Sequence, residues 1–133
     1  MKNNGLLPDT CAWIDYFRPG AAPLGQVLDQ ALSAETVYVC GPVLSELVQG
    51  AKSEKERSIL INALSALPCL EMNEALWIKA GQLSSALRQK GKTIPFSDIL
   101  IAVLALERKF AVLTIDDHFQ DIPDLTLRPM PGG

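Results

Sequence analysis

Asp98 occupies a position in the sequence where a carboxylate is costly. It is followed by eight consecutive apolar residues, Ile99 to Leu106, which predict a buried helix that begins near Pro95. Ile101 and Ala102, three and four positions further on, belong to this apolar run, so the carboxylate of Asp98 leans toward a dry surface. Carboxylates avoid such surroundings unless another group pairs with them. The pattern raises the question of what Asp98 contacts.

Three more acidic residues fall where elements are expected to begin or end. Asp9 ends the segment "GLLPD" and Asp116 ends "FAVLTID", and both segments read as strands. Glu46 lies about one turn into the helix that is expected after the strand "TVYVC". In βαβ units each helix starts at the carboxyl edge of the sheet and runs back against the strands. All four acids can therefore share one edge.

Carboxylates that converge in this way need a cation. Like charges within a few ångströms raise one another's pKa, so the groups cannot all ionise cheaply. A hard divalent ion removes that penalty, and ligand sets made only of oxygen suit Mg²⁺ or Mn²⁺. Such an ion can lower the pKa of a bound water, orient a phosphate and stabilise a leaving oxygen. This chemistry requires no Ser–His or Cys–His pair, and His118, the single histidine, is expected at the surface or in a supporting role.

Each acid also has an ordinary structural interpretation. Asp9 or Asp98 alone is consistent with a helix cap or a first-turn acid. Glu46 alone is consistent with a solvated glutamate, and Asp116 beside Asp117 with an aspartate pair in a turn. The sequence leaves these alternatives open for each residue taken singly.

Strands and helices alternate along the predicted chain, and together they must position the acids. Short punctuated turns separate them, which predicts an α/β domain with a mainly parallel sheet. Ligands bind such sheets at the carboxyl ends of the strands, where the acids lie. The expected strands are residues 5–9, 36–40, 69–73, 110–116 and 125–130, and the expected helices are residues 10–17, 24–33, 41–51, 53–67, 74–91 and 95–106.

Composition limits the class of protein. The 133 residues, 48% hydrophobic and 20% charged, predict one globular domain over residues 1–133. No signal peptide and no membrane span are recognised, so a cytoplasmic location is expected. The three cysteines (Cys11, Cys40 and Cys69) are expected to be reduced, buried small residues.

The net charge of the chain does not indicate a nucleic-acid partner. It is −3 at pH 7, so any contact with nucleic acid depends on a local basic patch. Arg88, Lys90 and Lys92 form the obvious candidate, and a solvated helix end that is favoured by the helix dipole explains the same residues.

The chain resembles the PIN domain family, and within it the VapC-type toxins of bacterial toxin–antitoxin pairs. The matching segments are "PDTCAWIDYF", "PVLSELVQG", "GKTIPFSDILIAVLAL" and "VLTIDDHF", which follow one another in the family's order over nearly the whole chain. The resemblance implies a three-layer α/β/α fold with a mainly parallel central sheet and one acidic pocket at its carboxyl end.

The resemblance also assigns roles to residues. It implies that Asp9, Glu46, Asp98 and Asp116 bind Mg²⁺ or Mn²⁺ and perform catalysis, with Phe119 as the aromatic residue that follows the "TID" ending. Asp117 is an additional acid that could replace or supplement Asp116. Candidate supporting residues are Thr10, Ser97 and Thr114.

The function that the resemblance implies is that of a metal-dependent endoribonuclease. It would be the toxin of a toxin–antitoxin pair, with an RNA substrate, a cognate antitoxin, a homodimeric state and no membrane association. The main alternative is a non-catalytic PIN-like module that binds nucleic acid or protein. A receiver-like α/β switch also gathers aspartates at strand ends, but it expects a lysine at the end of a late strand, and none stands there.

Overall fold

The computed structural model describes residues 5–20 and 22–130. The described strands are β1 (Leu6–Pro8), β2 (Val39–Cys40), β3 (Cys69–Leu70), β4 (Ala111–Leu113) and β5 (Thr126–Leu127). The described helices are α1 (Thr10–Phe17), α2 (Pro23–Ala34), α3 (Gly41–Gly50), α4 (Glu54–Ser65), α5 (Glu74–Gln89), α6 (Phe96–Arg108) and the 3₁₀ helix η1 (Asp117–Asp121). The predicted alternation of strands and helices is confirmed.

All strand pairings in the described part of the chain are parallel, as predicted. One group of strands has the order β1-β4-β5, with Leu7 opposite Val112, and β2 pairs with β3. A single parallel bridge between Leu6 and Val37 joins the two groups. The carboxyl ends of β1 and β4 consequently lie side by side, as the backbone hydrogen bond of 2.9 Å from Asp9 N to the Leu113 carbonyl shows.

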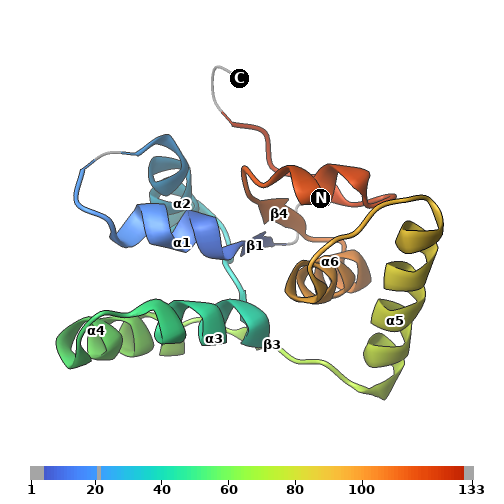
Figure 1. Ribbon diagram of the computed structural model, residues 1–133. Helices are drawn as coiled ribbons and strands as arrows, with labels where there is room; N and C mark the ends of the chain where they lie inside the picture. The colour runs from blue at the N-terminus through green and yellow to red at the C-terminus, as the bar shows by residue number, and fades with distance from the viewer. Residues whose placement is uncertain (1–4, 21, 131–133) are drawn as a thin grey trace.

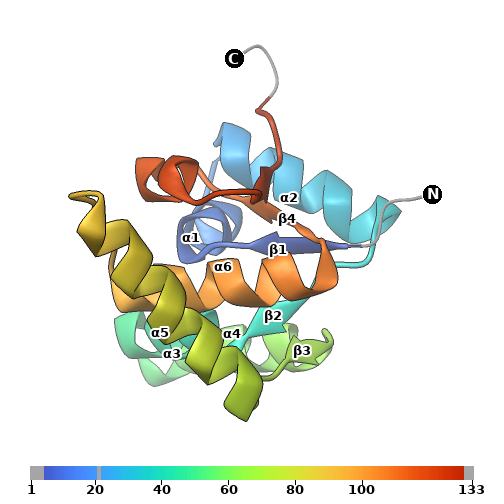
Figure 2. The same cartoon turned by 90° about the vertical axis from the view of Figure 1, so that its right-hand side faces the viewer.

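Helices cover both faces of this sheet. Figures 1 and 2 show α1 and α2 on one side of β1 and β4, and α6 with α5 outside it on the other side. Helix α3 contacts both α1 and α6 and packs against α4 (Figure 1). The arrangement agrees with the expected three-layer α/β/α fold, and it brings the N-termini of α1, α3 and α6 toward one region.

Close packing between α1 and α2 requires a glycine. A Cβ atom on Gly25 would lie 2.8 Å from the backbone carbonyl carbon and oxygen of Asp15, and 2.9 Å from Tyr16 N. The two backbones can approach this closely only without a side chain at residue 25. The contact fixes the direction of α1, whose first residue follows Asp9.

Helix α6 is buried along most of its length. Its core-facing residues include Ile99, Ile101 and Ala102, which are all inaccessible to solvent. Asp98 lies in its first turn and is only 7% exposed. The expectation that this carboxylate faces a dry surface is therefore confirmed. No helix among the described residues is long and apolar enough to cross a membrane.

Some local expectations were wrong. The strand expected over residues 110–116 ends at Leu113, so Asp116 lies beyond the ladder and caps η1 instead. The cysteines are free, as expected, but of the three only Cys40 is buried: Cys11 is half-buried and Cys69 in β3 is exposed. Ala63 is exposed as well, although it continues the apolar spacing of Leu60, Leu64 and Leu67 in the helix expected over residues 53–67.

The basic cluster at the end of α5 has the geometry of a solvated helix end. Arg88 lies in the last turn, and Arg88, Lys90 and Lys92 are all exposed. Lys92 Nζ lies 3.4 Å from Asp121 Oδ1 of η1, so part of its charge is already paired.

Candidate metal centre

Asp9 lies between β1 and α1 and is 6% exposed. Asp9 is the N-cap residue of α1, and its Oδ1 accepts a hydrogen bond of 2.7 Å from the N–H of Thr10, the first helical residue. Its Oδ2 accepts a hydrogen bond of 3.0 Å from the Thr114 hydroxyl, and the Cys11 thiol donates to the same oxygen at 3.6 Å. The carboxylate is thus held in one orientation by groups from α1 and from the end of β4.

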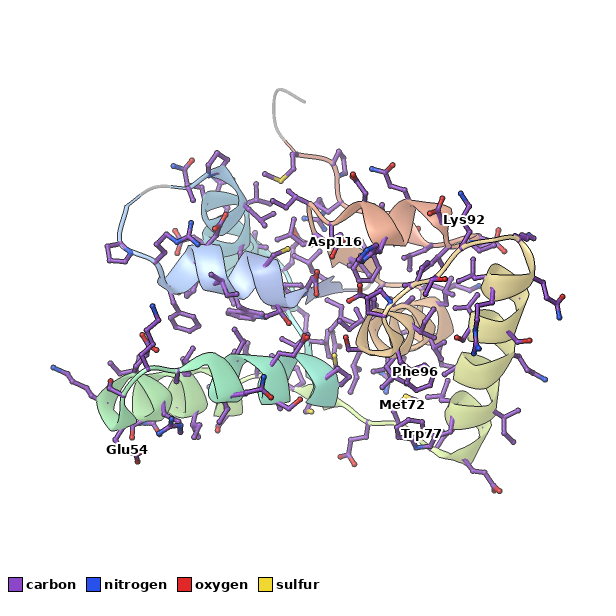
Figure 3. The ribbon with its side chains drawn as sticks, in the orientation of Figure 1. Glu54, Met72, Trp77, Lys92, Phe96 and Asp116 are labelled. Atoms are coloured by element: carbon purple, nitrogen blue, oxygen red, sulfur yellow. The ribbon has the colours of Figure 1, made fainter. Side chains whose placement is uncertain are left out.

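Thr114 connects two of the predicted acids. Its Oγ1 donates to Asp9 and accepts a hydrogen bond of 2.9 Å from Asp116 N. The Asp116 side chain in turn caps η1, because its Oδ1 accepts a hydrogen bond of 3.0 Å from His118 N. Figure 3 shows Asp116 in the middle of the molecule, above the space between α1 and α6. Thr114, predicted as a supporting hydrogen-bonding residue, has that geometry.

Asp98 and Asp116 share a third side chain. His118 Nδ1 lies 3.0 Å from Asp98 Oδ2 and 3.0 Å from Asp116 Oδ1. One donor atom from each of these residues lies within 4.8 Å of the others. The imidazole is partly exposed, whereas Asp98 is buried beneath it. The structure therefore places the single histidine directly on the acidic residues, a closer contact than the general supporting position expected for it.

Glu46 approaches the same region from α3. The Thr10 hydroxyl donates a hydrogen bond of 2.6 Å to Glu46 Oε1, and Thr10 N donates to Asp9. Glu46 is exposed, in contrast to Asp9 and Asp98. Thr10 therefore links the second predicted acid to the first, at the mouth of the site. Asp9, Glu46, Asp98 and Asp116 are called the acidic group below.

The electrostatics show that the acids influence one another. Burial raises the pKa of Asp9, the hydrogen bonds from Thr10, Thr114 and Cys11 oppose this rise, and the charge of Asp116 adds to it. Burial likewise raises the pKa of Asp98, against the hydrogen bond with His118, and the charges of Asp9 and Asp116 raise it further. The hydrogen bond to Asp98 raises the pKa of His118. The site favours a cation, and protons or the imidazolium supply part of that charge.

Asp117 and Ser97, two further predicted site residues, make no hydrogen bond to the acidic group among the contacts described. Asp117 is exposed, and its Oδ1 accepts a hydrogen bond of 3.5 Å from Gln120 Nε2, so Asp116 rather than Asp117 joins the acidic group. Ser97 lies inside the first turn of α6, one residue after its start, and does not cap the helix. It lines a second hollow together with Glu46 and Trp77.

The donor set fits a hard divalent cation. The carboxylates of Asp98 and Asp116 lie close together beside His118, and the charge of Asp9 acts on Asp98. Glu46 is linked to Asp9 through Thr10 and lies outside the close cluster found among the described residues. Carboxylate oxygens are the ligands that Mg²⁺ and Mn²⁺ prefer. The acidic residues can therefore hold a metal ion. What the sequence did not reveal is the imidazole among them. The only signal for it was the position of His118 two residues after Asp116 in a turn.

A family model and curated relatives match most of the chain. The PIN domain family model matches residues 6–125. Two curated relatives are a VapC ribonuclease from Mycobacterium bovis and Ribonuclease VapC11 from Mycobacterium tuberculosis. Each is 29% identical to this chain over 125 residues, which cover 91% of this chain and 93% of the relative.

Solved structures share the fold. A VapBC2 complex from Rickettsia felis bound to a promoter DNA fragment and a DNA-bound VapBC complex from Salmonella typhimurium each match with a TM-score of 0.79 and 23% identity. The matches cover 94% and 93% of this chain, and 98% and 96% of the matched chains. The family model spans nearly all of the described residues, and the parallel sheet with its helical layers agrees with the fold of these structures. The chain belongs to the PIN domain family.

Proposed function

We propose that this chain is a metal-dependent endoribonuclease that acts in the cytoplasm as the toxin of a toxin–antitoxin pair. The observation that supports this most directly is the acidic group at one edge, in which Asp9 and Asp98 are buried. Burying two acids beside a third is costly unless a cation is bound there. The curated relatives are named as ribonucleases, and this name supports RNA as the substrate of metal-dependent hydrolysis here.

The residues divide the work by their position. Asp9, Asp98 and Asp116 hold a Mg²⁺ or Mn²⁺ ion, which when bound supplies Lewis-acid chemistry and an activated water for phosphodiester hydrolysis. Glu46, exposed at the mouth, is a further ligand or the group that orients the attacking water. Thr10 and Thr114 keep the carboxylates in place, since each bonds to Asp9 and to a second part of the acidic group.

A groove beside the acidic group suits the antitoxin. It has a volume of about 710 Å³ and lies between α1, α3 and α4. The isoleucines Ile14 and Ile59 are 46% and 51% exposed in it, and Glu46 forms its end nearest the acids. The related complexes named VapBC contain a partner of the toxin. An apolar antitoxin segment in this groove would cover the isoleucines and reach the acidic group.

A homodimer is also part of this proposal. Trp77, Ile78 and Phe96 are large apolar side chains that remain 50%, 56% and 47% exposed. Met72 and Trp77 line one hollow together with Ser97, the residue after Phe96, and Figure 3 draws Met72 between the labels of Trp77 and Phe96. A second copy of the chain would remove this apolar surface from water. Light scattering of the purified toxin without antitoxin measures its mass and tests this expectation.

The central test compares Asp98, a member of the acidic group, with Asp117, an exposed acid outside it. We expect Asp98→Asn to abolish Mn²⁺-dependent cleavage of single-stranded RNA, because an amide is nearly isosteric but is a poor ligand. Asp117→Asn removes the same charge from an exposed position and should keep cleavage within about twofold. Equal cleavage by wild type and Asp98→Asn at saturating Mn²⁺ would refute the nuclease assignment and favour a non-catalytic binding module.

The toxin assignment has a separate test. Expression of the wild-type chain alone should arrest bacterial growth, expression of Asp98→Asn should not, and co-expression of the cognate antitoxin should restore growth. Unimpaired growth with abundant wild-type protein that cleaves RNA in vitro would indicate a nuclease with another cellular role.

A further inference from the structure

His118 has a position that the acidic group alone does not explain. Its Nδ1 lies at the same distance, 3.0 Å, from one oxygen of Asp98 and one oxygen of Asp116. One donor atom from each of the three residues lies within 4.8 Å of the others, and the residues come from α6, the N-cap of η1 and η1 itself. The imidazole nitrogen is therefore as close to both carboxylates as a ligand of a shared ion would be.

We propose that His118 Nδ1 is a nitrogen ligand of the divalent ion that Asp98 and Asp116 hold, and that it biases the site toward Mn²⁺ over Mg²⁺. The inference rests on the proposed metal site and adds a donor of a different chemical type to it.

The spacing of the donors supports this role. Two ligands at right angles on an octahedral ion, with bonds of about 2.1 Å, lie about 3.0 Å apart. The distances from Nδ1 to Asp98 Oδ2 and to Asp116 Oδ1 both have this value. The same distance serves a hydrogen bond when Nδ1 is protonated, so the side chain needs no large movement to exchange a proton for a metal.

The backbone holds the imidazole in this place. His118 N donates a hydrogen bond of 3.0 Å to Asp116 Oδ1, which anchors residue 118 to one of the acids. Phe119, the next residue, is 1% exposed and fixes η1 in the core. His118 itself is partly exposed, so its ring can adjust without disturbing the core. With the proton on Nε2, the lone pair of Nδ1 is available to a metal.

The expected consequence is metal selectivity. Mg²⁺ strongly prefers oxygen ligands and dehydrates reluctantly, whereas Mn²⁺ and later transition metals accept imidazole more readily. A site made only of carboxylates gains little preference between Mg²⁺ and Mn²⁺. Adding Nδ1 should make the affinity for Mn²⁺ depend on His118, while the affinity for Mg²⁺ depends mainly on the acids.

Pulsed electron paramagnetic resonance of Mn²⁺ tests the ligand directly. His118 is the only histidine of the chain, so in protein without a histidine tag any imidazole ¹⁴N coupling belongs to residue 118. We expect this coupling in wild type and its loss in His118→Asn. Asparagine keeps an amide near Nδ1 that can hydrogen-bond to the carboxylates, so a purely structural role would survive the change.

Calorimetric titration supplies the second readout. His118→Asn and His118→Ala should each lower the affinity for Mn²⁺ about tenfold and change the affinity for Mg²⁺ less than threefold. Asp98→Asn should weaken both metals, and Asp117→Asn neither. Mn²⁺ bound to wild type without ¹⁴N coupling, or bound as tightly or more tightly by His118→Ala, overturns the ligand role and leaves His118 as a competing cation. Absence of metal binding in wild type overturns the metal site itself.

Discussion

Replacing Asp98 by asparagine should stabilise the metal-free protein. Asp98 is 7% exposed, and burial and two neighbouring acids raise its pKa. A carboxyl group whose folded form binds its proton tenfold more tightly than the unfolded form costs about 1.4 kcal/mol of stability at neutral pH. We expect Asp98→Asn to recover on the order of 1 kcal/mol in EDTA, because the lost contact with the exposed His118 is screened by water. For a chain of this size that is a rise in Tm of about 3–5 °C.

The pH dependence follows from the same directions. The pKa values of Asp9 and Asp98 are raised above 3.8, so the native state binds their protons more tightly than the unfolded chain. The free energy of unfolding should fall as pH climbs from about 3.8 through the folded pKa values, and then level off. The pKa of His118 is raised above 6.5, so its contribution is complete below 6.5 and is lost as pH rises through its folded value.

Asp98→Asn should reduce the pH dependence of the free energy of unfolding in both the acidic range and the range above pH 6.5. The variant lacks one of the two buried carboxyl groups, so the free energy of unfolding should depend less on pH above 3.8. It also lacks the hydrogen bond that is the main cause of the raised pKa of His118, so the change in stability above pH 6.5 should shrink. Urea titrations of wild type and variant in EDTA, from pH 4 to pH 9, measure both effects. The matched control is Asp117→Asn, which removes an exposed charge outside the acidic group and should leave Tm within about 1 °C of wild type.

Metal should reverse the order of stability. Mn²⁺ at 100 times its Kd stabilises a native site by about 2.7 kcal/mol, so wild type gains roughly 10 °C, whereas Asp98→Asn gains little. A variant that is less stable than wild type in EDTA, with an unchanged pH profile and no metal effect on wild type, would refute the reasoning. Asp98 would then be an ordinary first-turn acid of α6.

Two other predictions concern the scaffold. Gly25→Ala places a Cβ atom 2.8 Å from the backbone of Asp15, so Tm should fall by an amount corresponding to about 1–3 kcal/mol. Gly50→Ala, where a Cβ meets nothing within 4 Å, should leave Tm unchanged or slightly higher. A thiol reagent at pH 8 should modify the exposed Cys69 first and spare Cys40, whose pKa burial raises to about 12, until the protein unfolds. Equal rates for the two thiols would contradict the described packing.

The order of elements could be predicted because the local signals were strong and agreed. The expected helix over residues 10–17 is α1 without a change of boundary, since Asp9 caps its start and Arg18-Pro19 ends it. The parallel arrangement followed from alternation, and it was the basis for expecting that four acids distant in the sequence share one edge. Handedness and direction in βαβ units are general, so this step needed no knowledge of contacts.

Strand lengths could not be predicted in the same way. The segment "TVYVC" has strong β propensity, yet only Val39–Cys40 forms a strand, with an isolated bridge at Val37. A strand is defined by hydrogen bonds to its neighbours, and the neighbours here are two or three residues long. Propensity describes how a segment fits a sheet and does not say how much sheet is available. The exposure of Ala63 and Cys69 could not be predicted for a similar reason. A sequence pattern shows which side chains share a face, but it does not show which elements cover that face.

The interpretations left open for the single acids turn out to be compatible with a shared site. Asp9 caps α1 and Asp116 caps η1, so both are turn or cap residues as well as members of the acidic group. A cap bond uses one lone pair of a carboxylate that has about four acceptor positions, so capacity for a cation remains. The cap also fixes the carboxylate at a helix start, where the helix dipole favours negative charge. Capping therefore prepares these acids to face one another, and the sequence signals for a cap and for a ligand coincide because one geometry serves both.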